Sequence, residues 1–293
     1  MQYVEDTFRS SDDRLNLCRH TWRPEGDVRG LLVFAHGILE HGQRHGSWAS
    51  RLADAGIAVT ALDHRGHGMS EGSRAWIDHF DQLQDDFTRL IGLSREAFPQ
   101  VPTFMMGFSM GGAVVAQTWL TRRPPVDGLI LMAPALETAL FPRLQKFSGW
   151  IDKICPRLRL FDLGASRKIS RDPKVIEAFQ ADPRVYHRAF PIHIAAEVLR
   201  VSREINRHFA DFDLPFLLLH GTGDVITGIE GCRRMYHQAC STDKTLNEYH
   251  EGLHDLLHEQ SPMCDQVYND LLQWLQTHIE PIQTDGKVNN GKT

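Results

Sequence analysis

Cysteine, long apolar runs and excess charge of one sign are all scarce in this chain, and each shortage excludes a class of protein. Five cysteines in 293 residues are an odd number, and no CxxC pair is present, so neither a disulfide framework nor a cysteine-ligated zinc site is expected. No apolar run approaches the roughly 18 residues of a membrane-spanning helix, and the first ten residues, MQYVEDTFRS, lack the apolar part of a secretory leader. A net charge of −5 indicates no nucleic-acid partner. We therefore expect a cytoplasmic, globular protein.

Apolar runs recur along the chain with helical segments between them. Such runs are typical of strands that are buried on both faces of a sheet. Strands that alternate with helices predict a mostly parallel sheet with helices on both sides. A hairpin with its turn at Asp12 and Asp13 precedes these strands. The six strands predicted after the hairpin are LLVFAHG (31–37), IAVTALD (57–63), TFMMG (103–107), LILMAPA (129–135), FLLLHGTGD (216–224) and TLNEY (245–249).

The alternation of strands and helices stops between residues 136 and 210. This stretch has helical patterning and two Asp-Pro breaks, at Asp172 and Asp182, but no convincing core strand. Because it lies between two strands of the predicted sheet, we interpret it as an inserted helical cap. The predicted division is a core of residues 1–135 and 211–280, a cap or lid of residues 136–210, and a flexible tail of residues 281–293.

The strongest chemical signal is GFSMGG at residues 107–112, directly after an apolar strand and directly before a helix. In that context GxSxG is typical of a nucleophile elbow, a strained turn that presents a serine at the end of the sheet. The N-terminus of the following helix favours negative charge nearby. A chance glycine-rich turn is the alternative interpretation. We predict that Ser109 is a nucleophile.

A serine hydroxyl needs a base, and in folds with this elbow an acid and a histidine follow the serine in that order. The turn after the FLLLHG strand supplies Asp224, and the loop after the last strand supplies His254. A turn-forming aspartate and a helix-capping histidine are the alternatives, and His250 and His258 compete with His254. Because both residues stand at the expected strand ends, we predict a Ser109–Asp224–His254 triad.

Two N–H groups must stabilise the oxyanion of an acyl-transfer intermediate. One is expected from the backbone of Met110, the residue after the nucleophile, and the other from the backbone of Ile38, in the loop after LLVFAHG. Since only the backbone donates, the side chain at position 38 matters little to this role.

Four segments together carry a resemblance to a known family. They are HGILEHGQRHGSWASRLADAGIAVTALDHRGHGMSEG (36–72), GFSMGG (107–112), GTGD (221–224) and GLHDLLHE (252–259). The chain resembles the monoacylglycerol lipase and lysophospholipase family of α/β-hydrolases from Arg14 to His278, including the DPRVYH segment of the cap. The first segment is much more specific than GxSxG, which most α/β-hydrolases share. The resemblance implies the α/β-hydrolase fold with a cap.

The resemblance also implies a role for the segment HGxxEHxxR, which in that family contacts the alcohol side of the substrate. Glu40 and Arg44 would then hold the glycerol hydroxyls, and the alternative is an ion pair that braces the oxyanion loop. The chain departs from the family at His45, where tyrosine is common, at Leu39, where glycine is frequent, and at Phe108, where histidine is usual. No departure removes a catalytic group, but all three bear on the acyl or alcohol preference.

Sixteen histidines, several of them between residues 36 and 67, raise a metal site as an alternative. The HxHxDH pattern of a binuclear zinc hydrolase is absent, and DHRGHG at residues 63–68 is typical of a loop. We expect hydrogen-bonding loop histidines and no catalytic metal.

The first part of the predicted cap is basic and amphipathic. Residues 141–171 hold eight basic residues and two acidic ones. Residues 143–171 therefore indicate contact with a membrane surface, and the alternative is an apolar face that covers the acyl pocket. The segment could both cover the acyl pocket and contact a membrane if the lid opens at a lipid surface. The apolar residues at helical spacing are Leu140, Leu144, Phe147, Ile151 and Ile154.

These features predict a serine hydrolase that cleaves carboxylic esters of apolar acyl chains through an acyl-serine intermediate, without a cofactor. By resemblance the best single substrate is a monoacylglycerol, which yields fatty acid and glycerol. A lysophospholipase and a general carboxylesterase or thioesterase are the alternatives with the same chemistry. A ligand-binding protein with little turnover is the alternative from another class.

Overall fold

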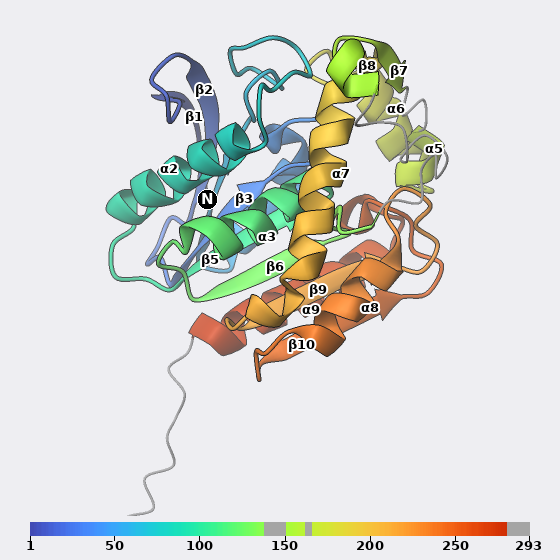
Figure 1. Cartoon of the computed structure of the whole chain (residues 1–293). Helices are drawn as coiled ribbons and strands as arrows, with labels where there is room; N and C mark the ends of the chain where they lie inside the picture. The colour runs from blue at the N-terminus through green and yellow to red at the C-terminus, as the bar shows by residue number, and fades with distance from the viewer. Residues whose placement is uncertain (138–150, 162–165, 280–293) are drawn as a thin grey trace, which may run out of the picture.

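A mostly parallel sheet of eight strands forms the centre of the molecule (Figure 1). The computed structural model describes residues 1–137, 151–161 and 166–279. The strand order is β1-β2-β4-β3-β5-β6-β9-β10, in which β2 is antiparallel to both of its neighbours and the other pairs are parallel. All eight predicted strands are present. They are β1 (Gln2–Arg9), β2 (Asn16–Arg23), β3 (Gly30–Ala35), β4 (Ile57–Leu62), β5 (Thr103–Phe108), β6 (Gly128–Met132), β9 (Phe216–Gly221) and β10 (Lys244–Tyr249).

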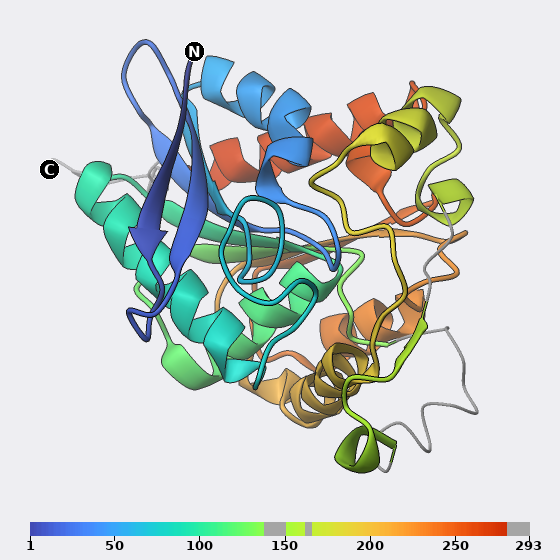
Figure 2. The ribbon, with the colours of Figure 1, turned by 90° about the horizontal axis from the view of Figure 1, so that it is seen from above.

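Helices cover both faces of the sheet (Figure 2), and for this reason every residue of β3, β4 and β5 is buried. One face is covered by α1 (Gly46–Asp54) and α9 (Met263–Ile279). The other face is covered by α2 (Asp81–Ala97), α3 (Met110–Arg122), α7 (Ile192–Arg207) and α8 (Ile229–Gln238). The connections of the described residues include the short 3₁₀ helices η1 (Gly42–His45), η2 (Phe209–Asp211) and η3 (Leu256–His258). Within the described ranges, no helix combines the length and the apolar character needed to cross a bilayer.

Between β6 and β9 the chain leaves the sheet. Residues 151–154 are helical, and β7 (Arg159–Phe161) pairs with β8 (Phe190–Pro191) in a separate two-stranded ribbon. The short helices α5 (Ser166–Ile169) and α6 (Pro173–Ala181) lie between these two strands. Helix α7, in contrast, buries Ile194, Val201 and Ile205 in the same core as α3, so it ties the insertion to the sheet. Residues 141–150 and 162–165 of the predicted amphipathic stretch and the predicted tail (281–293) lie outside the described residues.

Candidate active site

Ser109 occupies the sharp turn between β5 and α3. Its backbone has φ 55° and ψ −117°, which is a strained conformation for a residue with a side chain. A Cβ atom on Gly107 would lie 2.2 Å from the carbonyl oxygen of Gly111, and one on Gly111 would lie 2.0 Å from the carbonyl oxygen of Ala35. Glycine is therefore required on both sides of the serine, and the turn holds Ser109 at the carboxyl end of β5.

The structure brings the three predicted triad residues together. His254 Nε2 lies 2.9 Å from Ser109 Oγ, and His254 Nδ1 lies 2.7 Å from Asp224 Oδ2. Ser109 and His254 are only 6% and 4% exposed, so water screens these contacts weakly. His250 is exposed, and His258 pairs with a different carboxylate. These contacts place the candidate nucleophile, base and acid in the order that acyl transfer needs.

The Asp224 carboxylate is surrounded by donors. Its Oδ1 accepts the backbone N–H groups of Ile226 (2.7 Å) and Thr227 (3.1 Å), and its Oδ2 accepts the Thr227 hydroxyl (2.8 Å). Burial by itself raises the pKa of this carboxyl, but His254 and His220 outweigh burial and hold the pKa well below its usual range. Sequence reasoning missed Thr227 and His220. A threonine three residues after the acid, as in an Asx turn, was the available signal for the first.

The two predicted oxyanion donors lie on adjoining segments of backbone. Met110 is the first residue of α3, where helical N–H groups have no partner within the helix. In the described part of the chain, no group accepts a hydrogen bond from the N–H of Met110 or of Ile38. The close approach of Gly111 to Ala35 holds the start of α3 against the end of β3. Both N–H groups are therefore candidates for binding an oxyanion.

Glu40 and Arg44 lie in a buried ionic network. Glu40 Oε1 accepts the Gly37 N–H at 2.7 Å and lies 3.0 Å from His45 Nε2, while its Oε2 pairs with Arg44 at 2.8 Å. Arg44 also pairs with Asp255, at 2.5 Å. Burial raises the pKa of Glu40, but His45 and Arg44 together lower it to about 2. Both carboxylate oxygens of Glu40 therefore already have donors from this chain.

The three departures from the family pattern all lie in the packed interior. His45, Leu39 and Phe108 are each at most 4% exposed. Leu39 has φ 68°, the left-handed conformation in which glycine is favoured. The Phe108 ring lies 4.9 Å from the ring of His254 and 5.8 Å from that of His45. Phe108 therefore packs against the candidate base from the side of the sheet.

The histidines of the early loops pack against one another. The His36 ring lies 4.4 Å from the His64 ring and 5.6 Å from the His67 ring. Burial lowers the pKa of His64 to about 3 and that of His67 to about 4, so both are neutral at pH 7. Elsewhere in the described ranges, one group has side-chain atoms close enough together to share a metal ion. It is Glu5, Cys18 and His20, on β1 and β2.

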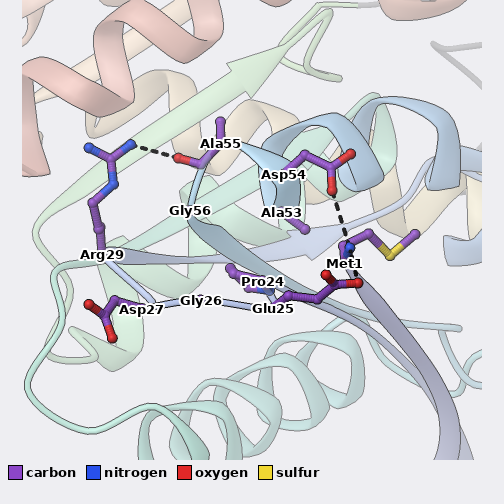
Figure 3. A pocket seen from close by; sticks show the side chains of 10 residues that line it. All are labelled: Met1, Pro24, Glu25, Gly26, Asp27, Arg29, Ala53, Asp54, Ala55 and Gly56. Carbon is purple, nitrogen blue, oxygen red and sulfur yellow. Dashed lines mark hydrogen bonds and ion pairs between the residues drawn. The ribbon is translucent and has the colours of Figure 1, made fainter.

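Two surface hollows lie away from the triad. One, of about 470 Å³, is at the start of the chain, where the Met1 ammonium group pairs with Glu25 at 3.1 Å and with Asp54 at 3.3 Å (Figure 3). The other, of about 270 Å³, includes Trp76 and Arg157. Neither is lined by a triad residue, and in the first the charged groups satisfy one another.

Comparison with known proteins agrees with this geometry. The family model described as "Serine aminopeptidase, S33" matches residues 26–261. The chain belongs to this family. The S33 match spans both the serine elbow and the segment with the candidate histidine, so it covers the whole candidate site.

Within the S33 family, the chain is similar to monoacylglycerol lipases. It is 32% identical to the monoacylglycerol lipase of Mycolicibacterium smegmatis over 260 residues, which are 88% of this chain and 92% of that protein. It is 28% identical to the monoglyceride lipase of Homo sapiens over 271 residues, 91% of this chain and 88% of that protein. The crystal structure of Paleococcus ferrophilus monoacylglycerol lipase matches with a TM-score of 0.79 and 27% identity, over 89% of this chain and 99% of that chain. The predicted resemblance and the α/β-hydrolase fold are confirmed.

Proposed function

We propose that this protein is a serine esterase that cleaves carboxylic esters of apolar acyl chains, with monoacylglycerol as its main substrate. The observation that carries the proposal is the pair of contacts from Ser109 Oγ to His254 (2.9 Å) and from His254 to Asp224 (2.7 Å). The similar monoacylglycerol lipases support the substrate class. The chemistry needs no metal and no organic cofactor.

The first half of the reaction acylates the serine. His254 Nε2 takes the Ser109 proton while Oγ attacks the ester carbonyl carbon, and Asp224 stabilises the imidazolium that forms. The N–H groups of Ile38 and Met110 donate to the oxyanion. His254 then gives its proton to the departing alcohol oxygen, and glycerol leaves.

The second half repeats these steps with water. His254 removes a proton from water, and the hydroxide attacks the acyl carbonyl carbon. Collapse of this second oxyanion breaks the bond to Ser109, which recovers its proton from His254. The products are a fatty acid and the free enzyme.

For Glu40 and Arg44 we propose a bracing role in the loop that carries Ile38. Glu40 binds the Gly37 N–H directly, and Arg44 links Glu40 to Asp255, which follows His254 in sequence. Contact with the glycerol hydroxyls, as the family resemblance implies, remains the alternative for both side chains. Hydrolysis of a glycerol ester compared with a methyl ester of the same fatty acid separates the two roles.

We also propose that the insertion of residues 136–210 acts as a cap whose segment 143–171 touches lipid surfaces. In the described part of that segment, Ile154 and Leu158 are 59% and 42% exposed, and Lys153 and Arg157 are exposed beside them. Apolar side chains among basic ones suit an anionic membrane surface. Charge reversal of Lys146 and Lys153 should weaken binding to anionic vesicles, and unchanged binding would remove the membrane part of the proposal.

The first experiment joins a covalent probe to a product assay. The protein is treated with a fluorophosphonate, the labelled residue is mapped, and glycerol release from 1-monoacylglycerol is measured for wild type and Ser109→Ala. We expect labelling at Ser109 and release that is lost in Ser109→Ala.

Other outcomes would change the proposed substrate or contradict the proposed esterase activity. Labelling without glycerol release would move the substrate to lysophospholipids, simple esters or thioesters. An amino-acid anilide belongs in the same panel, because the family description names an aminopeptidase. No labelling of folded protein would exclude the esterase and favour a ligand-binding protein.

A further inference from the structure

His220 lies beside the proposed acid, yet no step of the proposed mechanism uses it. It stands on β9, four residues before Asp224, and is fully buried. Its Nε2 lies 3.4 Å from Asp224 Oδ2 and 3.2 Å from the Thr227 carbonyl oxygen. Its Nδ1 lies 3.2 Å from the sulfur of Cys232, on α8. This buried imidazole therefore has polar partners on both nitrogens, which fix the orientation of its ring.

One oxygen of the acid faces both histidines. Asp224 Oδ2 lies 2.7 Å from His254 Nδ1, 2.8 Å from the Thr227 hydroxyl and 3.4 Å from His220 Nε2. The other oxygen accepts two backbone N–H groups. The carboxylate is therefore fixed in orientation, and each donor on Oδ2 takes part of the negative charge that stabilises the imidazolium of His254.

We propose that His220 is a positioning residue for the esterase reaction. Its Nε2–H donates to the Thr227 carbonyl oxygen and lies beside Asp224 Oδ2 at 3.4 Å, so His220 holds the turn that aims the carboxylate at His254 and moderates the charge that His254 experiences. The inference rests on the proposed function, because His254 must be the general base for the orientation of Asp224 to affect turnover.

The titratable groups around His220 come from three elements. Asp224 lies in the turn after β9, Cys232 on α8, and Glu248 on β10 directly beside His220 in the sheet register. Glu248 is paired with Arg233 of α8 at 2.6 and 2.8 Å, so its charge is largely compensated. Burial lowers the pKa of His220, but Cys232 and Asp224 outweigh burial and raise it to about 10. The nearby Asp224 carboxylate therefore favours the protonated form of His220.

The test compares two substitutions. His220→Gln keeps an N–H donor near the position of Nε2 but removes the positive charge, whereas His220→Leu removes both. For each variant, kcat, KM and the pH profile of kcat/KM are measured with 1-monoacylglycerol. The acidic limb of that profile reports the protonation of the free-enzyme base.

We expect His220→Leu to lower kcat about 10-fold or more while KM stays within about twofold, because the orientation of the base and not substrate binding is disturbed. We expect His220→Gln to restore kcat to within about threefold of wild type. In both variants the acidic limb should move to higher pH, since loss of a neighbouring cation makes His254 easier to protonate.

Two results would overturn the inference. One is wild-type kcat and a wild-type acidic limb in His220→Leu. The other is an equal loss of kcat in both variants with an unmoved limb, which packing alone would produce. If His220→Leu does not fold, His220→Gln decides by itself: a moved limb with wild-type KM supports the role, and an unmoved limb removes it.

Failure of the proposed function would look different. In that case wild-type protein would neither release glycerol nor label at Ser109. An active wild type with unaffected His220 variants would remove only the inference about His220.

Discussion

The backbone N–H of Tyr186 donates a hydrogen bond of 2.8 Å to the carbonyl oxygen of Leu39. This bond joins the insertion to the loop that carries Ile38, the proposed oxyanion donor. A second bond, from His41 Nε2 to Asp182 Oδ2 at 2.8 Å, joins the same two segments. Both bonds end within three residues of Ile38, so we expect a displacement of the insertion to disturb the loop that carries Ile38.

Asp182→Ala should therefore slow catalysis without unfolding the core. The substitution leaves the buried His41 side chain without its acceptor, and it also removes the acceptor for the Arg184 N–H. We expect the fluorophosphonate labelling rate of Ser109 to fall about 10-fold, as small displacements of catalytic groups do elsewhere. Asp182→Asn keeps an oxygen acceptor and is expected to recover most of the rate. Labelling of Asp182→Ala at the wild-type rate would show that the two segments are independent.

Gly111→Ala should inactivate the protein, because the added Cβ would lie 2.0 Å from the carbonyl oxygen of Ala35. Backbone on one side must move, and displacement of the elbow by about 1 Å can cost 100-fold in rate. The matched control is Gly92→Ala on α2, where the Cβ meets nothing within 4 Å. It should raise the free energy of unfolding by about 0.5–1 kcal/mol. Glycerol release and urea unfolding measure both effects, and an active Gly111→Ala protein would refute the strain argument.

The strands were predictable because each one is indicated by the hydrophobicity of its own residues. Each buried strand is a continuous apolar run, and a run such as 31–35 needs no knowledge of its neighbours to be recognised. The candidate triad was predictable for a related reason, since this fold places its nucleophile, acid and base after successive strand ends. Helix α8 was not foreseen. Most of its residues are polar, and it buries only Gly231, Cys232 and Met235, so its apolar stripe is too narrow to stand out.

Contacts between distant side chains were beyond sequence reasoning. Arg44 and Asp255 are 211 residues apart, and nothing in their local sequence indicates that they meet. His220 and Asp224 are only four residues apart in the sequence. Their contact nevertheless depends on the path of the backbone in the turn after β9 and on the rotamers of both side chains. The order of residues along the chain was enough to predict which three residues form the candidate triad. The side chains that surround the triad are determined by packing between distant segments.

Glu40→Gln distinguishes bracing from substrate binding. Removal of the charge weakens the hydrogen bonds to Arg44 and His45, but Arg44 keeps its pair with Asp255, so the free energy of unfolding should fall by about 1.5–3 kcal/mol. If Glu40 braces the oxyanion loop, kcat/KM should fall by the same factor for 1-monoacylglycerol and for the methyl ester of the same fatty acid. If it binds glycerol hydroxyls, only the glycerol ester should be affected, and that result would reverse our assignment.

Buried neutral histidines should make the protein acid-sensitive above the range in which carboxylates titrate. Burial lowers the pKa of His64 from 6.5 to about 3, and neither ring nitrogen has a hydrogen-bond partner among the described residues. Because the unfolded chain binds this proton and the native protein does not, stability is fully present above pH 6.5 and is lost as the pH falls towards 3. Between pH 6.5 and pH 4 this one group should remove about 3 kcal/mol.

His64→Leu tests this pH dependence, since leucine has a similar volume and cannot bind a proton. The free energy of unfolding at pH 7 should change by less than about 1.5 kcal/mol, because no side-chain hydrogen bond is lost. The decline between pH 6.5 and pH 4, followed by urea titration at several pH values, should become shallower. The same substitution at the exposed His250 is the control and should leave the decline unchanged. An equally steep decline in His64→Leu would mean that His64 is not the neutral, buried group the structure describes.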